Sequence, residues 1–241
     1  MDERGDVRIA VRERYGAIAE GGGCGCGTTG STCCTSELDY SAAEKAAVPE
    51  GANLGLGCGA PVALAGAKPG ETVLDLGSGA GVDVFLAARA VGPEGRVIGV
   101  DMTPAMIDRA RTNAAKGGYT NVEFRLGEIE HLPVPDESVD VIVSNCVVNL
   151  SPEKGQVFRE AYRVLKPGGR MLLSDLVLER PLPADVREST EAYVGCIAGA
   201  SLRGEYLSMI RDAGFQGVEV VAEGRYGTEP VTSVQVRANK P

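Results

Sequence analysis

The sequence contains a single histidine in 241 residues, which restricts the chemistry available to the chain. His131 is the sole candidate for a histidine base or an imidazole ligand to zinc. It lies in a stretch that reads as a loop, and we expect it to have no chemical role. Mechanisms and metal sites that need several histidines are therefore excluded.

Long apolar runs and basic clusters are also missing. No stretch approaches the roughly 18 apolar residues of a membrane span, and the start, MDERGDVRIAVRERYG, lacks the apolar core of a signal peptide. The net charge is −9, from 24 basic and 33 acidic residues, with no basic stripe that would bind a phosphate backbone. We therefore expect a cytoplasmic protein with neither nucleic-acid nor membrane partners.

What the chain does have is seven cysteines. In a reducing compartment they should be mostly free thiols, metal ligands or redox partners, and an odd number does not make a disulfide framework. Four of them occur in residues 21–36, GGGCGCGTTGSTCCTS, which has too little apolar surface to order itself and predicts a flexible arm. These four are Cys24, Cys26, Cys33 and Cys34.

The patterning divides the chain into three parts. Residues 1–50 hold an amphipathic helix over 1–20, with Val7, Val11 and Ile18 on one face, followed by the arm. Residues 51–178 alternate strands and helices, as in a mostly parallel sheet with helices on both faces. Residues 179–241 add a segment over the substrate pocket and the last strands of the same domain. We expect strands in 72–77, 95–101, 122–127, 139–147, 170–177, 217–224 and 232–238, and helices in 82–91, 103–118 (N-cap Thr103), 152–166 (ended by PGG) and 203–213.

A glycine turn joins the first strand of the alternating region to a helix. Asp75, Gly77, Gly79 and Gly81 lie in DLGSGAG, where glycines allow close approach of a ligand to the helix N-terminus. Asp101 ends the next strand, where a carboxylate can accept hydrogen bonds from both ribose hydroxyls of a nucleoside. Because Asp75 would repel phosphates but attract a cationic amino-acid group, the pattern favours an adenosyl ligand without pyrophosphate.

These motifs resemble the class I S-adenosylmethionine-dependent methyltransferases over about residues 50–178, through VLDLGSGAG, VIGVDMT and VLKPGGR. The resemblance implies a Rossmann-like fold with a seven-stranded sheet whose last strand is antiparallel, and S-adenosylmethionine as cofactor. Asp83 flanks this site and is expected only to cap or pack. The residues expected to bind the cofactor are Asp75, Gly77, Ser78, Gly79, Asp101, Met102, Gly127, Glu128, Ile129 and Asn145.

Three cysteines outside the arm lie where such a fold holds its substrate. Cys146 lies at the end of the fourth strand in SNCVVNL, Cys196 lies in YVGCIAGAS, and Cys58 lies between glycines in LGLGCGAP. If they converge, three thiolates indicate a soft, thiophilic substrate atom. Trivalent arsenic fits, because it keeps a lone pair when bound by three sulfurs and needs no general base. Zinc prefers four ligands and has no lone pair to methylate.

The same residues resemble the arsenite methyltransferases in their shorter bacterial and archaeal form, over about residues 1–215, through GLGCGAPVAL, NCVVNLSP and GCIAGA. The resemblance implies that Cys58, Cys146 and Cys196 hold arsenic(III), and that thioredoxin or glutathione supports turnover. Arsenite is expected free or as its glutathione complex, with no permanently bound metal. Cys33 and Cys34 match a region linked to disulfide relay or arsenic delivery, while Cys24 and Cys26 are assigned a scavenging or redox role.

Two alternatives stay open at this point. A carbon or oxygen methyltransferase of the quinone-biosynthesis type would carry the cysteines incidentally, packed as small apolar residues. A thiol-rich protein that sequesters metals or metalloids would bind arsenite without consuming any cofactor. The intact turn from Asp75 to Gly81, together with Asp101, argues against the second.

Overall fold

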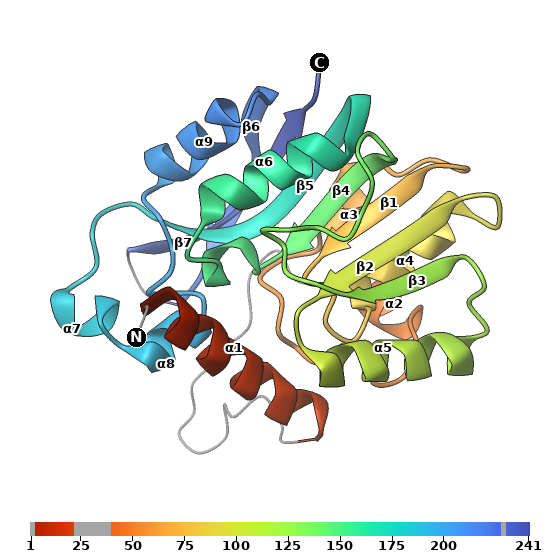
Figure 1. Ribbon diagram of the computed structural model, residues 1–241, viewed down its shortest axis with the longest axis horizontal. Coiled ribbons are helices and arrows are strands. Elements are labelled where there is room, and N and C mark those ends of the chain that lie inside the picture. The colour runs from red at the N-terminus through yellow and green to blue at the C-terminus, as the bar shows by residue number, and fades with distance from the viewer. Residues whose placement is uncertain (1–2, 22–39, 228–229) are drawn as a thin grey trace.

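A computed structural model describes residues 3–21, 40–227 and 230–241. Its centre is one seven-stranded sheet with helices on both faces, in the strand order β3-β2-β1-β4-β5-β7-β6 (Figure 1). The first five strands run parallel, and β7 is antiparallel to both of its neighbours. The predicted Rossmann-like α/β architecture is confirmed.

The strands form where the sequence has short apolar runs, because both faces of the sheet are covered. Val73 and Leu74 illustrate the alternation: both are fully buried, yet they belong to the cores on opposite faces of the sheet. The strands are β1 (Thr72–Leu76), β2 (Arg96–Asp101), β3 (Val122–Leu126), β4 (Val139–Asn145), β5 (Leu165–Leu178), β6 (Gln216–Arg225) and β7 (Val231–Asn239).

Helices cover the two faces as separate groups. Phe158 and Tyr206 come from the helices of one face, and Phe85 and Ile107 from those of the other. The long helices are α1 (Glu3–Ala19), α4 (Val82–Val91), α5 (Pro104–Gly117), α6 (Lys154–Val164) and α9 (Arg203–Asp212). The short ones are α2 (Ala42–Ala46), α3 (Pro61–Ala65), η1 (Val148–Leu150), α7 (Ala184–Arg187) and α8 (Thr190–Val194).

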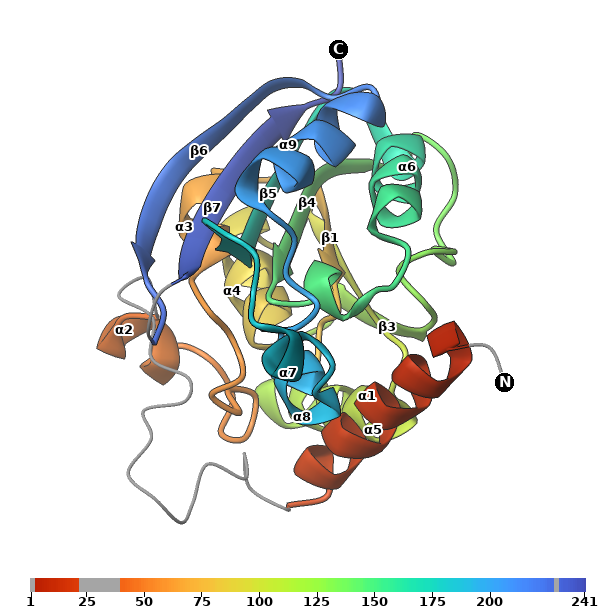
Figure 2. The same cartoon turned by 90° about the vertical axis from the view of Figure 1, so that its left-hand side faces the viewer.

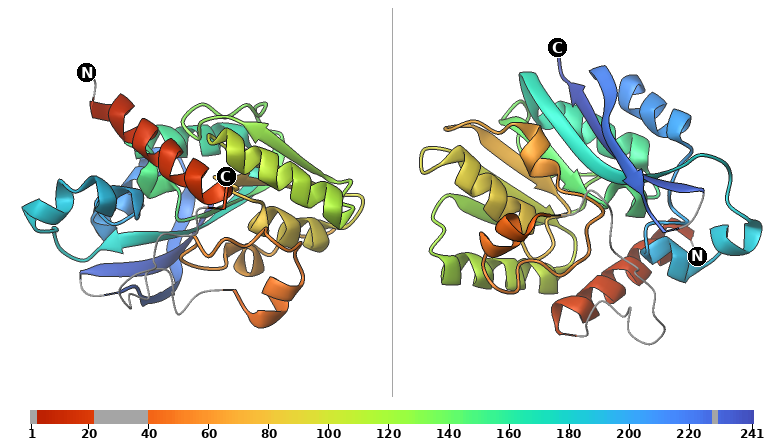
Figure 3. Two further views of the ribbon diagram at one scale, coloured as in Figure 1. Left: turned by 90° about the horizontal axis from the view of Figure 1, so that it is seen from below. Right: turned by 180° about the vertical axis from the view of Figure 1, so that it is seen from behind.

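Helix α1 lies apart from both faces of the sheet and contacts α5 and α8 (Figures 2 and 3). Val11 and Ile18 are buried, as the amphipathic pattern predicted. None of the helices in the described ranges combines the length and the apolar character needed to cross a bilayer.

Two local predictions differ from the structure. Thr103 precedes α5 at the N-cap position, but its side chain makes no capping bond and instead hydrogen bonds the Asp101 carboxylate. Helix α6 ends at Val164, and PGG lies within β5, which begins at Leu165. The strand prediction missed this early start because proline and glycine disfavour a regular ladder, and the pairing of β4 with β5 is indeed irregular there.

Candidate active site

The carboxyl ends of the parallel strands border a pocket, as expected for an open sheet at the point where the strand order reverses. Gly77 turns the chain there with φ of +71°, and a Cβ at this position would collide with the side chain of Val147. Gly79 also has a left-handed φ, of +50°, and its amide donates a 2.9 Å hydrogen bond to Asp101 Oδ2. The other oxygen of Asp101 accepts from the Thr103 amide at 2.8 Å. The turn is therefore fixed by the same carboxylate that faces the pocket.

Three carboxylates, those of the buried Asp75 and Asp83 and of the half-buried Asp101, give the pocket an acidic character. Burial raises the pKa of Asp75 well above its usual value, and repulsion from Asp83 and Asp101 raises it further. Burial also raises the pKa of Asp83 to about 6, against hydrogen bonds from Tyr40 and Asn145 that lower it. Burial raises the pKa of Asp101 in the same way, opposed by the bonds from the Thr103 and Gly79 amides. Such a site favours a ligand that brings positive charge.

The pocket residues fit S-adenosylmethionine, which carries an ammonium group and a sulfonium. Ser78 Oγ and Asp83 Oδ1 are buried and have no hydrogen-bond partner among the described residues, so a polar ligand group would satisfy them. Arg8 is the one basic residue that lines the described pocket, and it is paired with Glu130 at 3.1 Å and Glu153 at 3.0 Å. The carboxylates therefore remain available to a cationic ligand.

Nine of the ten predicted cofactor residues line this pocket: Asp75, Gly77, Ser78, Gly79, Asp101, Met102, Gly127, Ile129 and Asn145. Glu128 does not. Its half-exposed side chain lies 3.6 Å from Arg12, and its contact with the adenine edge stays a prediction. In the loop after β3, the acidic residue that lines the pocket is Glu130 instead, which accepts a 2.6 Å hydrogen bond from Ser151. His131 is exposed and lies outside the lining, in line with its expected lack of a role.

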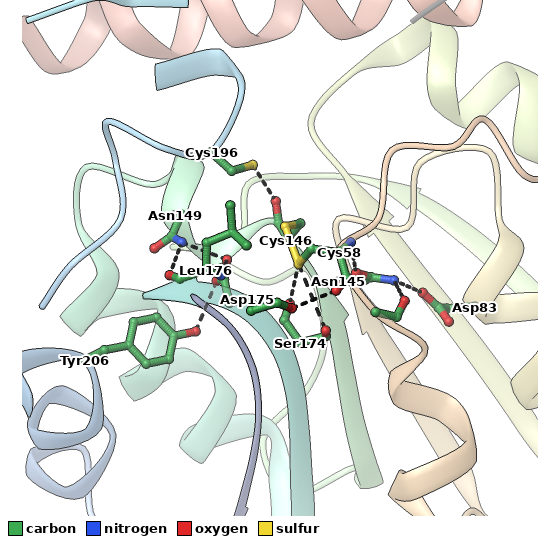
Figure 4. Close-up of a disulfide and its surroundings, with 12 residues drawn as sticks. Cys58, Asp83, Asn145, Cys146, Asn149, Ser174, Asp175, Leu176, Cys196 and Tyr206 are labelled. Carbon is green, nitrogen blue, oxygen red and sulfur yellow. Dashed lines mark hydrogen bonds between the residues drawn. A yellow bond between two sulfur atoms is a disulfide. The ribbon is translucent and has the colours of Figure 1, made fainter. Parts of the chain in front are cut away.

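Cys58 and Cys146 meet beside the pocket and form a disulfide, with Cα atoms 5.8 Å apart (Figure 4). Of the states expected for the cysteines, this pair is therefore oxidised rather than in the free-thiol form. Cys58 can approach β4 because the residue before it is Gly57. A Cβ on Gly57 would lie 2.7 Å from the side-chain amide nitrogen of Asn145. On its other side, a Cβ on Gly59 would collide with Ser174 Oγ. Pairing requires two segments remote in sequence to touch.

Cys196 joins this pair from the segment after β5. Its thiol donates a 3.0 Å hydrogen bond to the carbonyl oxygen of Cys146 (Figure 4). The three cysteines share one buried cluster with Val11, Leu150 and Leu176. The three cysteines thus lie in one buried cluster, but Cys196 does not belong to the group of ligand atoms within 4.8 Å of one another, and joint binding of arsenic by all three stays a prediction. Cys24, Cys26, Cys33 and Cys34 lie outside the described residues.

Asn145 connects the cysteines with the cofactor pocket. Its side-chain oxygen accepts a 2.9 Å hydrogen bond from the Cys58 amide. Its Nδ2 contacts the carbonyl oxygen of Gly59 at 2.6 Å, Tyr40 Oη at 2.8 Å and Asp83 Oδ2 at 3.3 Å. A change at the acidic end of the pocket can therefore reach the loop that carries Cys58.

Several residues at the site were missed from the sequence. Tyr40, Arg8 and Tyr15 line the pocket from segments remote from the alternating region, and no local pattern marks them. Asp83 was expected only to cap or pack. Asp175 left a signal that was not used, since it is a charged residue inside the apolar run RMLLSDLV. A carboxylate that is 1% exposed inside a strand needs polar partners, and this one has them.

The fold and pocket define an S-adenosylmethionine-dependent methyltransferase, and a family model described as a methyltransferase domain matches residues 67–214. The arsenite methyltransferase of Halobacterium salinarum is 55% identical over 229 residues, which cover 89% of this chain and 59% of the relative. That of Aquipseudomonas alcaligenes is 43% identical over 176 residues, covering 69% and 50%. The chain thus spans less than two thirds of the length of these curated relatives.

A solved structure agrees with these relatives. The crystal structure of an arsenic(III) S-adenosylmethionine methyltransferase from Chlamydomonas reinhardtii matches with a TM-score of 0.69 and 36% identity, over 83% of this chain and 70% of that one. The chain belongs to the arsenite methyltransferase family.

Proposed function

We propose that this chain transfers a methyl group from S-adenosylmethionine to trivalent arsenic held by the sulfurs of Cys58, Cys146 and Cys196. The observation that carries the proposal is the meeting of these three cysteines in one buried cluster beside the pocket. Three sulfur ligands suit a soft atom of low coordination number. Because the attacking lone pair belongs to arsenic itself, the protein does not need to supply a general base.

The cofactor would be held by residues whose hydrogen-bonding capacity is incomplete. Asp101 uses two acceptor positions on backbone amides and has others for ribose hydroxyls. Asp75 and Asp83 lie where an ammonium group would neutralise their buried charge. When bound, S-adenosylmethionine supplies an electrophilic methyl carbon to the arsenic lone pair. The chain aligns the two reactants, and orientation of bound reactants contributes several kcal/mol, up to about 10.

Arsenite binding requires reduction of the Cys58–Cys146 disulfide. A dithiol reductant gives two electrons and two protons to the disulfide and is itself oxidised. The three thiols then exchange with arsenite: three arsenic–sulfur bonds form, and each thiol proton leaves with an arsenic hydroxyl as water. Methylation formally oxidises arsenic by two electrons, which one dithiol, or two molecules of a monothiol such as glutathione, must return. We assign this task to thioredoxin or glutathione, with Cys33 and Cys34 as a relay.

The remaining assignments follow from the same proposal. The substrate is arsenite, free or as its glutathione complex. The protein works in the cytoplasm, where a thiol reductant is at hand. It needs no permanently bound metal, no nucleic acid and no membrane.

The test is incubation of the reduced chain with arsenite, S-adenosylmethionine and a dithiol, followed by arsenic speciation. We expect methylated arsenic and one S-adenosylhomocysteine per methyl group formed. Cys146→Ser should lower the rate at least about 100-fold, because a displaced reactant loses most of the benefit of orientation. The variant should still bind S-adenosylhomocysteine about as well as the unmodified chain, which controls for folding.

The alternatives give different results. Methylation of a quinone precursor that survives Cys146→Ser, with arsenite unchanged, would support a carbon or oxygen methyltransferase. Stoichiometric arsenite binding without consumption of the cofactor would support a sequestering protein. Unchanged inorganic arsenic in the presence of bound cofactor would contradict our proposal.

A further inference from the structure

The two sulfurs of the disulfide and a nearby carboxylate form a group of possible metal ligands, distinct from the three cysteines of the proposed arsenic site. The sulfurs of Cys58 and Cys146 and a carboxylate oxygen of Asp175 all lie within 4.8 Å of one another, and all three residues are buried (Figure 4). The sheet register explains this arrangement. Asn145 at the end of β4 pairs with Ser174 of β5, so that the next residue of each chain segment, Cys146 and Asp175, lie at the same level. The proposed methyl transfer makes no use of Asp175.

The Asp175 carboxylate is held by three donors. Its Oδ1 accepts hydrogen bonds from Asn149 Nδ2 at 2.8 Å and from the Leu176 amide at 2.9 Å, and its Oδ2 accepts one from the Tyr206 hydroxyl at 3.1 Å. A carboxylate offers about four acceptor positions, so one is left for a ligand. Donors that fix the orientation of a carboxylate are the usual surroundings of a metal ligand.

Charge also favours a cation at this point. As ligands, two thiolates and one carboxylate would place three negative charges in a buried volume, which is costly without a counter-charge. A divalent cation removes two of them. Lys154 donates to the Ser151 carbonyl oxygen at 3.0 Å; burial lowers its pKa, and attraction to Asp175, Cys196 and Glu130 opposes that shift.

We propose that, once the disulfide is reduced, Cys58, Cys146 and Asp175 bind a thiophilic divalent cation of the zinc class. Two thiol protons are released, and the cation takes two sulfurs, one carboxylate oxygen and a water, a tetrahedral set with one exchangeable position. This binding is reversible, and it is therefore compatible with the expectation that the chain has no permanently bound metal. Cation and arsenite share two sulfurs but differ in the third donor, which is Asp175 for the cation and Cys196 for arsenic.

The cation therefore excludes arsenite, and zinc inhibits methylation. Cation binding rests only on the geometry of the three donors. The inhibition rests, in addition, on the proposed function.

The experiment uses the full chain with Cys24, Cys26, Cys33 and Cys34 replaced by serine, so that the arm does not bind soft metals. The chain is reduced anaerobically and titrated with Cd²⁺, followed by thiolate-to-cadmium absorption in the ultraviolet, and with Zn²⁺ against a chelator. We expect one ion per reduced chain and none for the oxidised chain. Asp175→Asn should weaken binding at least about 10-fold, because it replaces an anionic ligand by a neutral amide.

Cys196→Ser is the matched control. It should leave cadmium affinity within a few-fold of the parent chain and abolish arsenite binding, whereas Asp175→Asn should retain arsenite binding. X-ray absorption of the cadmium-loaded parent chain, which does not depend on any site variant, should show two sulfur ligands with oxygen completing the set. Three sulfur ligands, or cadmium affinity unchanged in Asp175→Asn, would overturn the proposal. Cadmium binding as expected without any arsenite methylation would leave it intact and contradict the proposed function instead.

Discussion

At the scale of single residues, the site stands out by its backbone. Cys146 and Cys196 have φ of +59° and +66°, and within the described ranges the one other non-glycine residue with positive φ is Glu137. A left-handed conformation costs a residue with a Cβ about 1–2 kcal/mol. Surrounding structure must impose this conformation, and such residues gather at functional sites. The two cysteines are therefore held in place by the fold rather than by their own preference.

A pH dependence follows from Asp83, whose pKa burial raises to about 6. Above this pH the carboxylate is ionised and attracts the ammonium group of the cofactor, while below it the group becomes neutral. We therefore predict that affinity for S-adenosylhomocysteine falls by up to about 10-fold per pH unit below about 6. Calorimetric titration across this range at constant ionic strength measures it.

Asp83→Asn is the control for this effect. It should bind more weakly at neutral pH and lose much of the dependence, with the remainder due to Asp75, whose pKa burial also raises. A pH profile identical in the variant and the unmodified chain would show that Asp83 does not set the affinity.

At the scale of elements, helix α1 adds one wall to the pocket at the strand ends. Arg8, Val11 and Tyr15 line it, and the Tyr15 hydroxyl donates to the Val194 carbonyl oxygen of α8 at 3.3 Å. The far end of the helix is held by Arg109, which donates to the Ala19 carbonyl oxygen at 2.7 Å. An amphipathic helix from the start of the chain thus separates the strand ends from solvent.

We predict that Arg8→Met loosens α1. Methionine keeps the apolar stem of the side chain but leaves Glu130, which is 4% exposed, without its cation. Because Arg8 is itself partly exposed, we expect a loss of about 1–2 kcal/mol rather than the larger cost of a fully buried pair. Hydrogen exchange should show faster exchange of α1 amides, and the affinity for S-adenosylhomocysteine should fall.

Arg12→Met provides the comparison on the same helix. The pair of Arg12 with Glu128 is 3.6 Å long and its side chains are about 46% and 37% exposed, so its loss should change little. Equal effects of the two substitutions would mean that α1 is held by its apolar face alone.

At the scale of the whole molecule, the disulfide links the segment before β1 to the end of β4, across 88 residues. Closing a loop of this length restricts the unfolded chain and stabilises the fold by about 4.6 kcal/mol in the chain-entropy description. We predict that reduction lowers the free energy of unfolding by up to this amount. Denaturant unfolding with and without a dithiol measures the difference.

The double variant Cys58→Ser, Cys146→Ser isolates the contribution of this disulfide. Its stability should not respond to the reductant, because Cys196 contributes no bond to the pair. A response as large as that of the unmodified chain would assign the effect to cysteines in residues 22–39. Substrate binding and disulfide stabilisation are thus mutually exclusive states of the same two sulfurs.

Much of the fold was predictable because its signals are local. The bounds of α4 and the first four strands were predicted to within one or two residues, since apolar runs and glycine turns mark them. The early start of β5 at Leu165 was not, because tertiary pairing overrode the usual effect of PGG. At the site, the turn from Asp75 to Gly79 was found by its spacing, whereas Tyr40 and Arg8 carry no local signal.

The sequence by itself determined the alternating architecture, the glycine turn, the acid at the end of β2 and the three cysteines set apart from the arm. Each depends on residues close together in the chain, whose periodicity and turn chemistry act before any long-range contact forms. Only the tertiary structure decided that Cys58 pairs with Cys146, that Asp175 lies beside them, and that α1 covers the pocket. Those are contacts between distant segments: the register of β4 against β5 and the packing of two glycines around Cys58 set the first two, and the contacts of α1 with α5 and α8 set the third.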